Sequence, residues 1–218
     1  MAFNVNDFKT RGLTLGGARP TLFQVTMDLP TSISPGTNLF QPKFAFTCSA
    51  ATIPASTVDP INVSYFGRQI KVAGDRTFAN WSVSIMNDED YIVRNAFEAW
   101  MNGLNSHVGN KRLIGDNQTS PGLSYKADAT ITHFAKGGPN GTAGSNASTG
   151  ADSIIKQYQF VGLFPVELDA MNMSWDTTNQ IQTFGVTFAY DYWLPMVNGT
   201  QTIDTGASGG AGAATVVF

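Results

Sequence analysis

The side chains that could do chemistry are few, and they share no motif. The two histidines, His107 and His133, belong to no HExxH or Cys/His cluster, and isolated histidines give no metal-ligand spacing. The single cysteine, Cys48, is expected to lie in a strand as a small buried hydrophobe, because a nucleophilic thiol needs a basic partner and the sequence nominates none. We therefore predict no catalytic, cofactor-binding or metal site, and we do not expect an enzyme.

An acidic run, Asp88-Glu89-Asp90, could be taken for a metal or acid/base cluster. It comes just before a stretch, residues 90–104, whose apolar side chains recur at helical spacing. These side chains are Val93, Ala96, Phe97, Trp100 and Leu104. Carboxylates at a helix start interact favourably with the helix dipole, so we interpret the run as helix-terminal. Asn87 or Asp88 is expected to cap this helix and Gly103 to end it.

The sequence shows no pattern for binding phosphates or nucleic acid. Glycine is abundant, but neither GxxxxGK(S/T) nor a strand–GxGxxG–helix unit occurs. The net charge is −3 and no Lys/Arg-rich block is present, whereas a nucleic-acid binder normally carries a basic patch. Readout of a DNA sequence is therefore not expected.

The dominant pattern is period-two alternation, which predicts strands with one buried face. In Trp81-Ser82-Val83-Ser84-Ile85 the large apolar residues share one face and the serines the other. Strands are expected at 22–29, 43–51, 61–72, 81–85, 125–133, 153–161, 171–175 and 184–192. The predicted fold is mainly β, an antiparallel β-sandwich or barrel with one flanking α-helix, whose stripe packs on the Trp81 face.

The composition indicates a protein whose exterior meets other protein. Charged residues make up 13 % of the 218 residues, against about 25 % in a typical soluble domain, and monomers usually keep a charged surface. We expect no signal peptide and no membrane span. One cysteine excludes an internal disulfide framework, so folding in a reducing cytoplasm is expected.

Several blocks of the sequence resemble a known family. They are TCSAATIPA at 47–55, the segment 61–66, RQIKVAGDRTF at 68–78, WSVSIMNDE at 81–89, GLFP at 162–165, SWD at 174–176, IQTF at 181–184 and DYW at 191–193. In order and spacing they resemble the tail tube protein of T4-like contractile-tailed phages, from roughly residue 20 to 193.

The resemblance implies a structural subunit that forms hexameric rings, which stack into a tube with a lumen for genome ejection. It implies further partners: the tail sheath protein, the tape-measure protein, the baseplate tube initiator, and DNA that passes without sequence-specific binding. The expected location is the virion tail tube, assembled in the host cytoplasm. No cofactor is implied.

The segment 61–72 is our candidate for a lumen-lining hairpin, with a turn expected at Ala73-Gly74-Asp75 because a turn favours glycine. Four charges, Arg68, Lys71, Asp75 and Arg76, are the candidates for subunit or ring contacts. They could equally be solvated surface charges.

The sequence departs from the family pattern in three places. Residues 30–42 and 137–150 have loop composition and look like insertions, and residues 194–218 form a Gly/Ala/Thr-rich tail after a tube domain at 1–193. Three alternatives stay open: a baseplate tube initiator, a tube of a related contractile injection or secretion system, and, from another class, a soluble β-sandwich binding module, which predicts a stable monomer.

Overall fold

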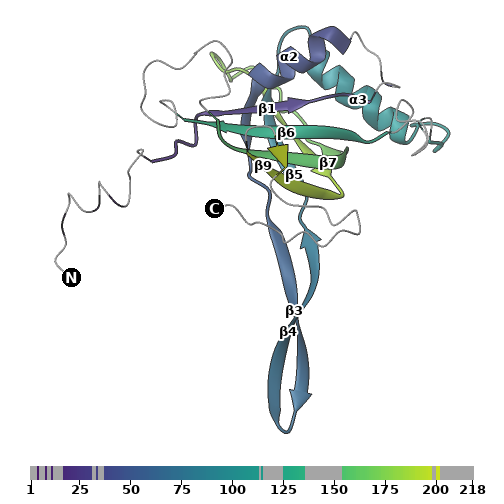
Figure 1. Cartoon of the computed structure of the whole chain (residues 1–218). Helices are drawn as coiled ribbons and strands as arrows, with labels where there is room; N and C mark the ends of the chain where they lie inside the picture. Colours follow the sequence, from purple (N-terminus) through teal and green to yellow (C-terminus); the bar gives the residue numbers. More distant parts are fainter. Residues whose placement is uncertain are drawn as a thin grey trace. The chain divides into compact units, whose positions relative to one another are not determined.

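The computed structural model (Figure 1) describes residues 17–30, 37–112, 125–135, 154–197 and 200–201, with residues 4, 8, 11, 33 and 114 singly. The chain divides into two compact units. Unit 1 combines Met1–Gln24, Ile131–Gln157 and Pro195–Phe218, and unit 2 combines Val25–Thr130 and Tyr158–Leu194. The predicted insertion at 137–150 lies outside the described residues, as does the tail beyond residue 201.

Unit 2 is built on an antiparallel sheet with the strand order β1-β6-β7-β8-β5-β2. The bounds are β1 Phe23–Met27, β2 Cys48–Ala51, β5 Trp81–Met86, β6 Ala127–Phe134, β7 Ile154–Leu168 and β8 Thr183–Ala189. β9 (Tyr192–Val197) pairs with β7. The mainly β, antiparallel fold predicted from the sequence is confirmed.

The pairing of β5 with β8 at the centre of this sheet shows how alternating apolar side chains form the core. In β5 the buried Trp81, Val83 and Ile85 lie opposite the buried Phe188, Val186 and Phe184 of β8. Ser82 and Ser84 point to the other face, because successive side chains of a strand alternate. The predicted division of β5 into an apolar and a polar face is confirmed.

Helix α3 (Ile92–Leu104) packs on the apolar face, with the predicted Val93, Ala96, Phe97 and Trp100 buried. Its predicted ends were wrong. The residue before the helix is Tyr91, in the left-handed region at φ 54°, and Asn87 instead donates to Gln182. Gly103 lies within the helix, where an added Cβ would collide with Ile114.

A second helix, α2 (Thr37–Thr47), replaces the predicted loop end at 37–42 and the predicted strand start at 43–47. Phe44 and Phe46 would share a face in a strand, but here Phe44 is fully buried and Phe46 is 79 % exposed. Phe40 and Phe44, one helical turn apart, both pack on Phe97. The described residues therefore hold two flanking helices where the sequence predicted one, and α2 and α3 lie on the same side of the sheet (Figure 1).

β3 (Ser56–Tyr65) and β4 (Arg68–Phe78) form a separate two-stranded antiparallel sheet that projects from the unit 2 sheet (Figure 1). The turn predicted at Ala73-Gly74-Asp75 was wrong. The chain turns at Phe66-Gly67, where both residues have positive φ, as a two-residue hairpin turn of type I′ requires. Gly74 lies instead at a bulge, where a Cβ would collide with the Asp59 carbonyl.

In the described part of unit 1, the end of β6 and the start of β7 are joined by a hydrogen bond from Gln157 Nε2 to Thr132 Oγ1, at 3.1 Å. β9 pairs with β10 (Thr200–Gln201), so strand structure runs past residue 193. None of the helices in the described residues is long and apolar enough to cross a membrane.

Candidate assembly surfaces

The side chains that could do chemistry form no cluster in the described part of the chain. Among the described residues no three His, Cys, Asp or Glu side chains gather as a metal site. His107 is exposed after α3, and His133 lies 2.7 Å from the Arg19 carbonyl oxygen in unit 1. Burial raises the pKa of the Cys48 thiol to about 12, although a hydrogen bond with the Ala50 backbone opposes this. The thiol is therefore protonated and weakly nucleophilic at neutral pH.

The acidic run has a structural role that the sequence did not identify in full. The Lys43 ammonium of α2 donates to Asp88 Oδ2 at 2.7 Å and also pairs with Asp90. This hydrogen bond lowers the pKa of Asp88, helped by the Glu89 backbone N–H. Asp90 Oδ1 also accepts from the Ile92 N–H at the first turn of α3. The run therefore ties α2 to the start of α3.

The β3–β4 hairpin has one apolar and one polar face. The pairs Ile61–Val72, Val63–Ile70 and Tyr65–Arg68 share one face, because opposite residues in an antiparallel ladder lie on the same side. Asn62–Lys71 and Ser64–Gln69 share the other face. The apolar side chains are about half exposed and Phe66 at the turn is 90 % exposed. An exposed apolar sheet face of this kind marks an interaction surface.

The structure brings the four charged interface candidates together on one strand. Arg68, Lys71, Asp75 and Arg76 all lie on β4 and are all exposed. Arg68 lies on the apolar face beside Ile70, whereas Lys71 lies on the polar face. Whether they make subunit contacts stays a prediction.

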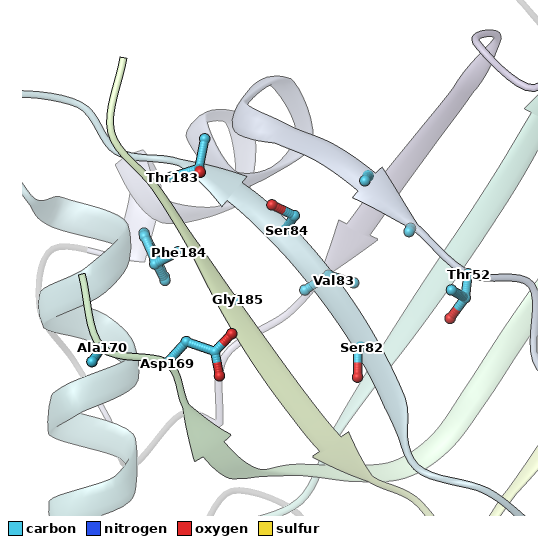
Figure 2. A pocket seen from close by; sticks show the side chains of 11 residues that line it. Thr52, Ser82, Val83, Ser84, Asp169, Ala170, Thr183, Phe184 and Gly185 are labelled. Atoms are coloured by element: carbon cyan, nitrogen blue, oxygen red, sulfur yellow. The ribbon is translucent and has the colours of Figure 1, made fainter. Parts of the chain in front are cut away.

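A second surface is the open face of β2, β5 and β8, opposite the helices (Figure 2). It forms a shallow depression of about 470 Å³ whose polar lining includes Ser82, Ser84 and Thr183. Asp169 lies over Gly185, so closely that an added Cβ would collide with its carboxylate. Ser82 Oγ and Thr187 Oγ1 are 3.2 Å apart on the same face. The face therefore presents small hydroxyls and one carboxylate beside small apolar side chains such as Ala50 and Ala170.

A third surface is the loop at residues 169–182, which joins β7 to β8. The strand predicted at 171–175 was wrong, since this segment is irregular. Three large apolar side chains are exposed on it: Met173, Trp175 and Ile181, with Trp175 fully exposed. Alternation in MNMSW mimics a strand, so sequence reasoning missed this surface.

Comparison with known proteins identifies relatives over most of the chain. The family model described as "Phage tail tube protein" matches residues 18–196. Tail tube protein gp19 of Enterobacteria phage T4 is 34 % identical over 188 residues, which cover 86 % of this chain and 98 % of that protein. Tail tube protein gp19 of Enterobacteria phage T6 is 33 % identical, with the same coverage.

A solved structure shares the fold at low identity. It is the sheath-tube complex of the extracellular contractile injection system PVC in the extended state, with a TM-score of 0.50 and 14 % identity. The match covers 90 % of this chain and 99 % of that chain.

Proposed function

The chain belongs to the phage tail tube protein family, and on that premise we propose that it is the structural subunit of a contractile tail tube, forming hexameric rings that stack around a lumen for genome ejection. Members of this family are virion components, and assembly in the host cytoplasm is part of the proposal. The observation that carries it is the match to gp19 over nearly the full length of both proteins.

The exposed surfaces support repeated self-assembly. β2 lies at one edge of the sheet. An open edge strand offers its unpaired backbone N–H and C=O groups to a strand of another subunit. Closing such edges around a ring fixes the subunit number, while head-to-tail stacking stays open and grows a filament. Such contacts would cover much of the surface and explain why only 13 % of the residues are charged.

We place the lumen at the open face of β5 and β8. The side chains that this face presents include Ser82, Ser84, Thr183 and Thr187, with Asp169 over Gly185. None of them is basic, and a wall without Lys or Arg makes no phosphate contacts that would hold DNA. Lining by the hairpin 61–72 stays a prediction, as do the partnerships with sheath, tape-measure protein and baseplate initiator.

A basic lumen is expected to trap DNA. Tubes of a Ser84→Arg/Thr187→Arg variant, assembled with a short DNA duplex, should retain the duplex after sedimentation and protect it from nuclease. Retention should fall steeply with salt, because phosphate contacts release counterions. The Ser84→Gln/Thr187→Gln variant controls for side-chain size. DNA that co-sediments but is digested would place this face outside the lumen.

Seeded growth tests the function itself. Sheared tubes or isolated baseplates, added to the purified subunit, should remove the lag in light scattering, because a tube subunit adds to an existing end. Boiled seeds serve as the control. A subunit that stays monomeric with intact seeds would instead support a binding module.

A further inference from the structure

Two features of unit 2 lie at opposite ends of helix α3: the exposed loop 169–182 and a depression of about 480 Å³. The loop meets the first turn of α3, where Arg94 Nη1 donates to the Asp169 carbonyl oxygen at 3.3 Å. The depression lies at Leu104, the last residue of α3. A helix of 13 residues spans about 20 Å, so the two features are well separated on one subunit.

The depression is lined by aromatic rings, amides and one cation. The rings of Tyr125 and Phe164 meet edge to face with centroids 5.6 Å apart, and the Tyr125 carbonyl oxygen accepts from Trp100 Nε1 at 2.9 Å. The Arg112 guanidinium lies over the Tyr125 ring, 5.0 Å from its centroid. The other described residues of the lining are Leu104, Asn105 and Asn110. Contacts within the subunit therefore form the depression before any partner binds.

The loop presents Trp175 and Asp176 at the tip of a hydrogen-bonded turn. The Thr177 hydroxyl donates to the Ser174 carbonyl oxygen at 2.8 Å, and the Asp176 N–H donates to Ser174 Oγ at 3.3 Å. Trp175, between them, is fully exposed, and Trp is among the residues most enriched at the energetic centres of interfaces. Because the turn is held by its own hydrogen bonds, docking of Trp175 orders little additional backbone.

The charges of the two features are complementary. None of the ion pairs among the described residues includes Arg112 or Asp176. The loop 169–182 contains two aspartates and no basic residue, whereas the described lining of the depression contains Arg112 and no acidic residue. Phe66, the exposed ring at the hairpin turn, is close to Arg68 in the chain, and like charges disfavour a contact with Arg112. The loop is therefore the better occupant of the depression.

We propose that Trp175 of one subunit inserts into the depression at the end of α3 in a second copy of this chain within the same ring, and that Asp176 pairs with Arg112 of that copy. Each subunit carries both features, and a head-to-tail contact of this kind closes into a ring when its rotation closes. The proposal rests on the proposed function, because it assigns a contact within the ring that the function requires.

The first test is Trp175→Ala, which removes a fully exposed side chain and should leave the subunit folded. The subunit concentration needed for rings, measured by sedimentation velocity, should rise about tenfold or more, as truncation of an interface anchor does. Phe46→Ala removes another largely exposed ring and should leave this concentration unchanged. Circular dichroism checks the fold of both variants. Rings of Trp175→Ala at an unchanged concentration would overturn the proposal.

The second test exchanges the two charges. Arg112→Asp and Asp176→Arg should each weaken ring formation, and the combined variant should restore it, since repulsion becomes attraction again. Restoration is a result that simple unfolding would not produce. A combined variant no better than the single variants would contradict the pairing of Arg112 with Asp176.

The third test locates the contact by chemical crosslinking. In a Cys48→Ala background, Lys111→Cys beside Arg112 and Thr178→Cys on the loop, both at exposed positions, should be joined between copies by a bismaleimide. Covalent oligomers of the variant that carries both cysteines should stop at six, because the ring closes. Absence of crosslinks would overturn the proposal, as would a series of oligomers past six, which would place the contact between rings.

The outcomes separate this proposal from the proposed function. Rings of the unmodified protein, together with any of the contradicting results above, would overturn the docking of Trp175 and leave the tube function standing. Failure of the unmodified protein to form rings or tubes, even with seeds, would overturn the tube function itself.

Discussion

Removal of residues 62–71, the outer part of the β3–β4 hairpin, is expected to abolish tube assembly and to leave the subunit folded. In this variant an Asn-Gly turn replaces residues 62–71 and connects the paired Ile61 and Val72, which a two-residue turn can do. All the removed residues are exposed, so the core loses no contact. The midpoint of thermal unfolding should shift by only a few degrees, roughly the effect of 1 kcal/mol or less.

Sedimentation velocity and circular dichroism measure the two expected effects of this deletion. The matched control is Ser64→Ala/Gln69→Ala, which alters the polar face of the hairpin and keeps its apolar face. Tubes formed by the shortened variant would show that the hairpin is dispensable. A collapse of the fold would show that the hairpin contributes to the core after all.

Phe97→Ala is expected to lower the free energy of unfolding by about 3–5 kcal/mol, the usual cost of deleting a buried aromatic ring. Phe97 is fully buried, and its ring centroid lies 5.6 Å from that of Phe40, 6.0 Å from Phe44 and 5.7 Å from Phe188. The ring therefore joins both helices to the sheet. A loss of this size is a large part of the 5–15 kcal/mol typical of a domain.

Chemical denaturation of the dispersed subunit measures this loss. Phe46→Ala is the matched control, because Phe46 lies on α2 but is 79 % exposed, and a surface change usually stays within about 0.5 kcal/mol. Equal effects of the two substitutions would contradict the assignment of Phe97 to the core and of Phe46 to the surface.

The elements that could be predicted from sequence are those whose period matches their burial. β5 and β8 alternate because one face of each is covered, and α3 carries a helical stripe because one side packs on the sheet. α2 was missed since Phe44 and Phe46 imitate strand alternation, although Phe40 and Phe44 carry the helical signal. Pro42 within α2 also favoured a loop.

The assembly surfaces were only partly accessible to sequence reasoning. A long strand pair at 61–72 was expected, but in the sequence either Gly67 or Gly74 could supply its turn. In the structure only Phe66-Gly67 adopts positive φ at both positions. The approach of Asp169 to Gly185 depends on pairing between β7 and β8, which sequence pattern does not specify. Trp175 follows the alternation of a strand in the sequence, although it is fully exposed in an irregular loop.

Electron microscopy of the purified protein in negative stain, at low and at high salt, shows whether the subunit assembles into rings and tubes. We expect rings or hollow tubes with six-fold end views, formed by the protein alone or on added tube ends. Dispersed monomers at every concentration, even with added tube ends and baseplates, would contradict it.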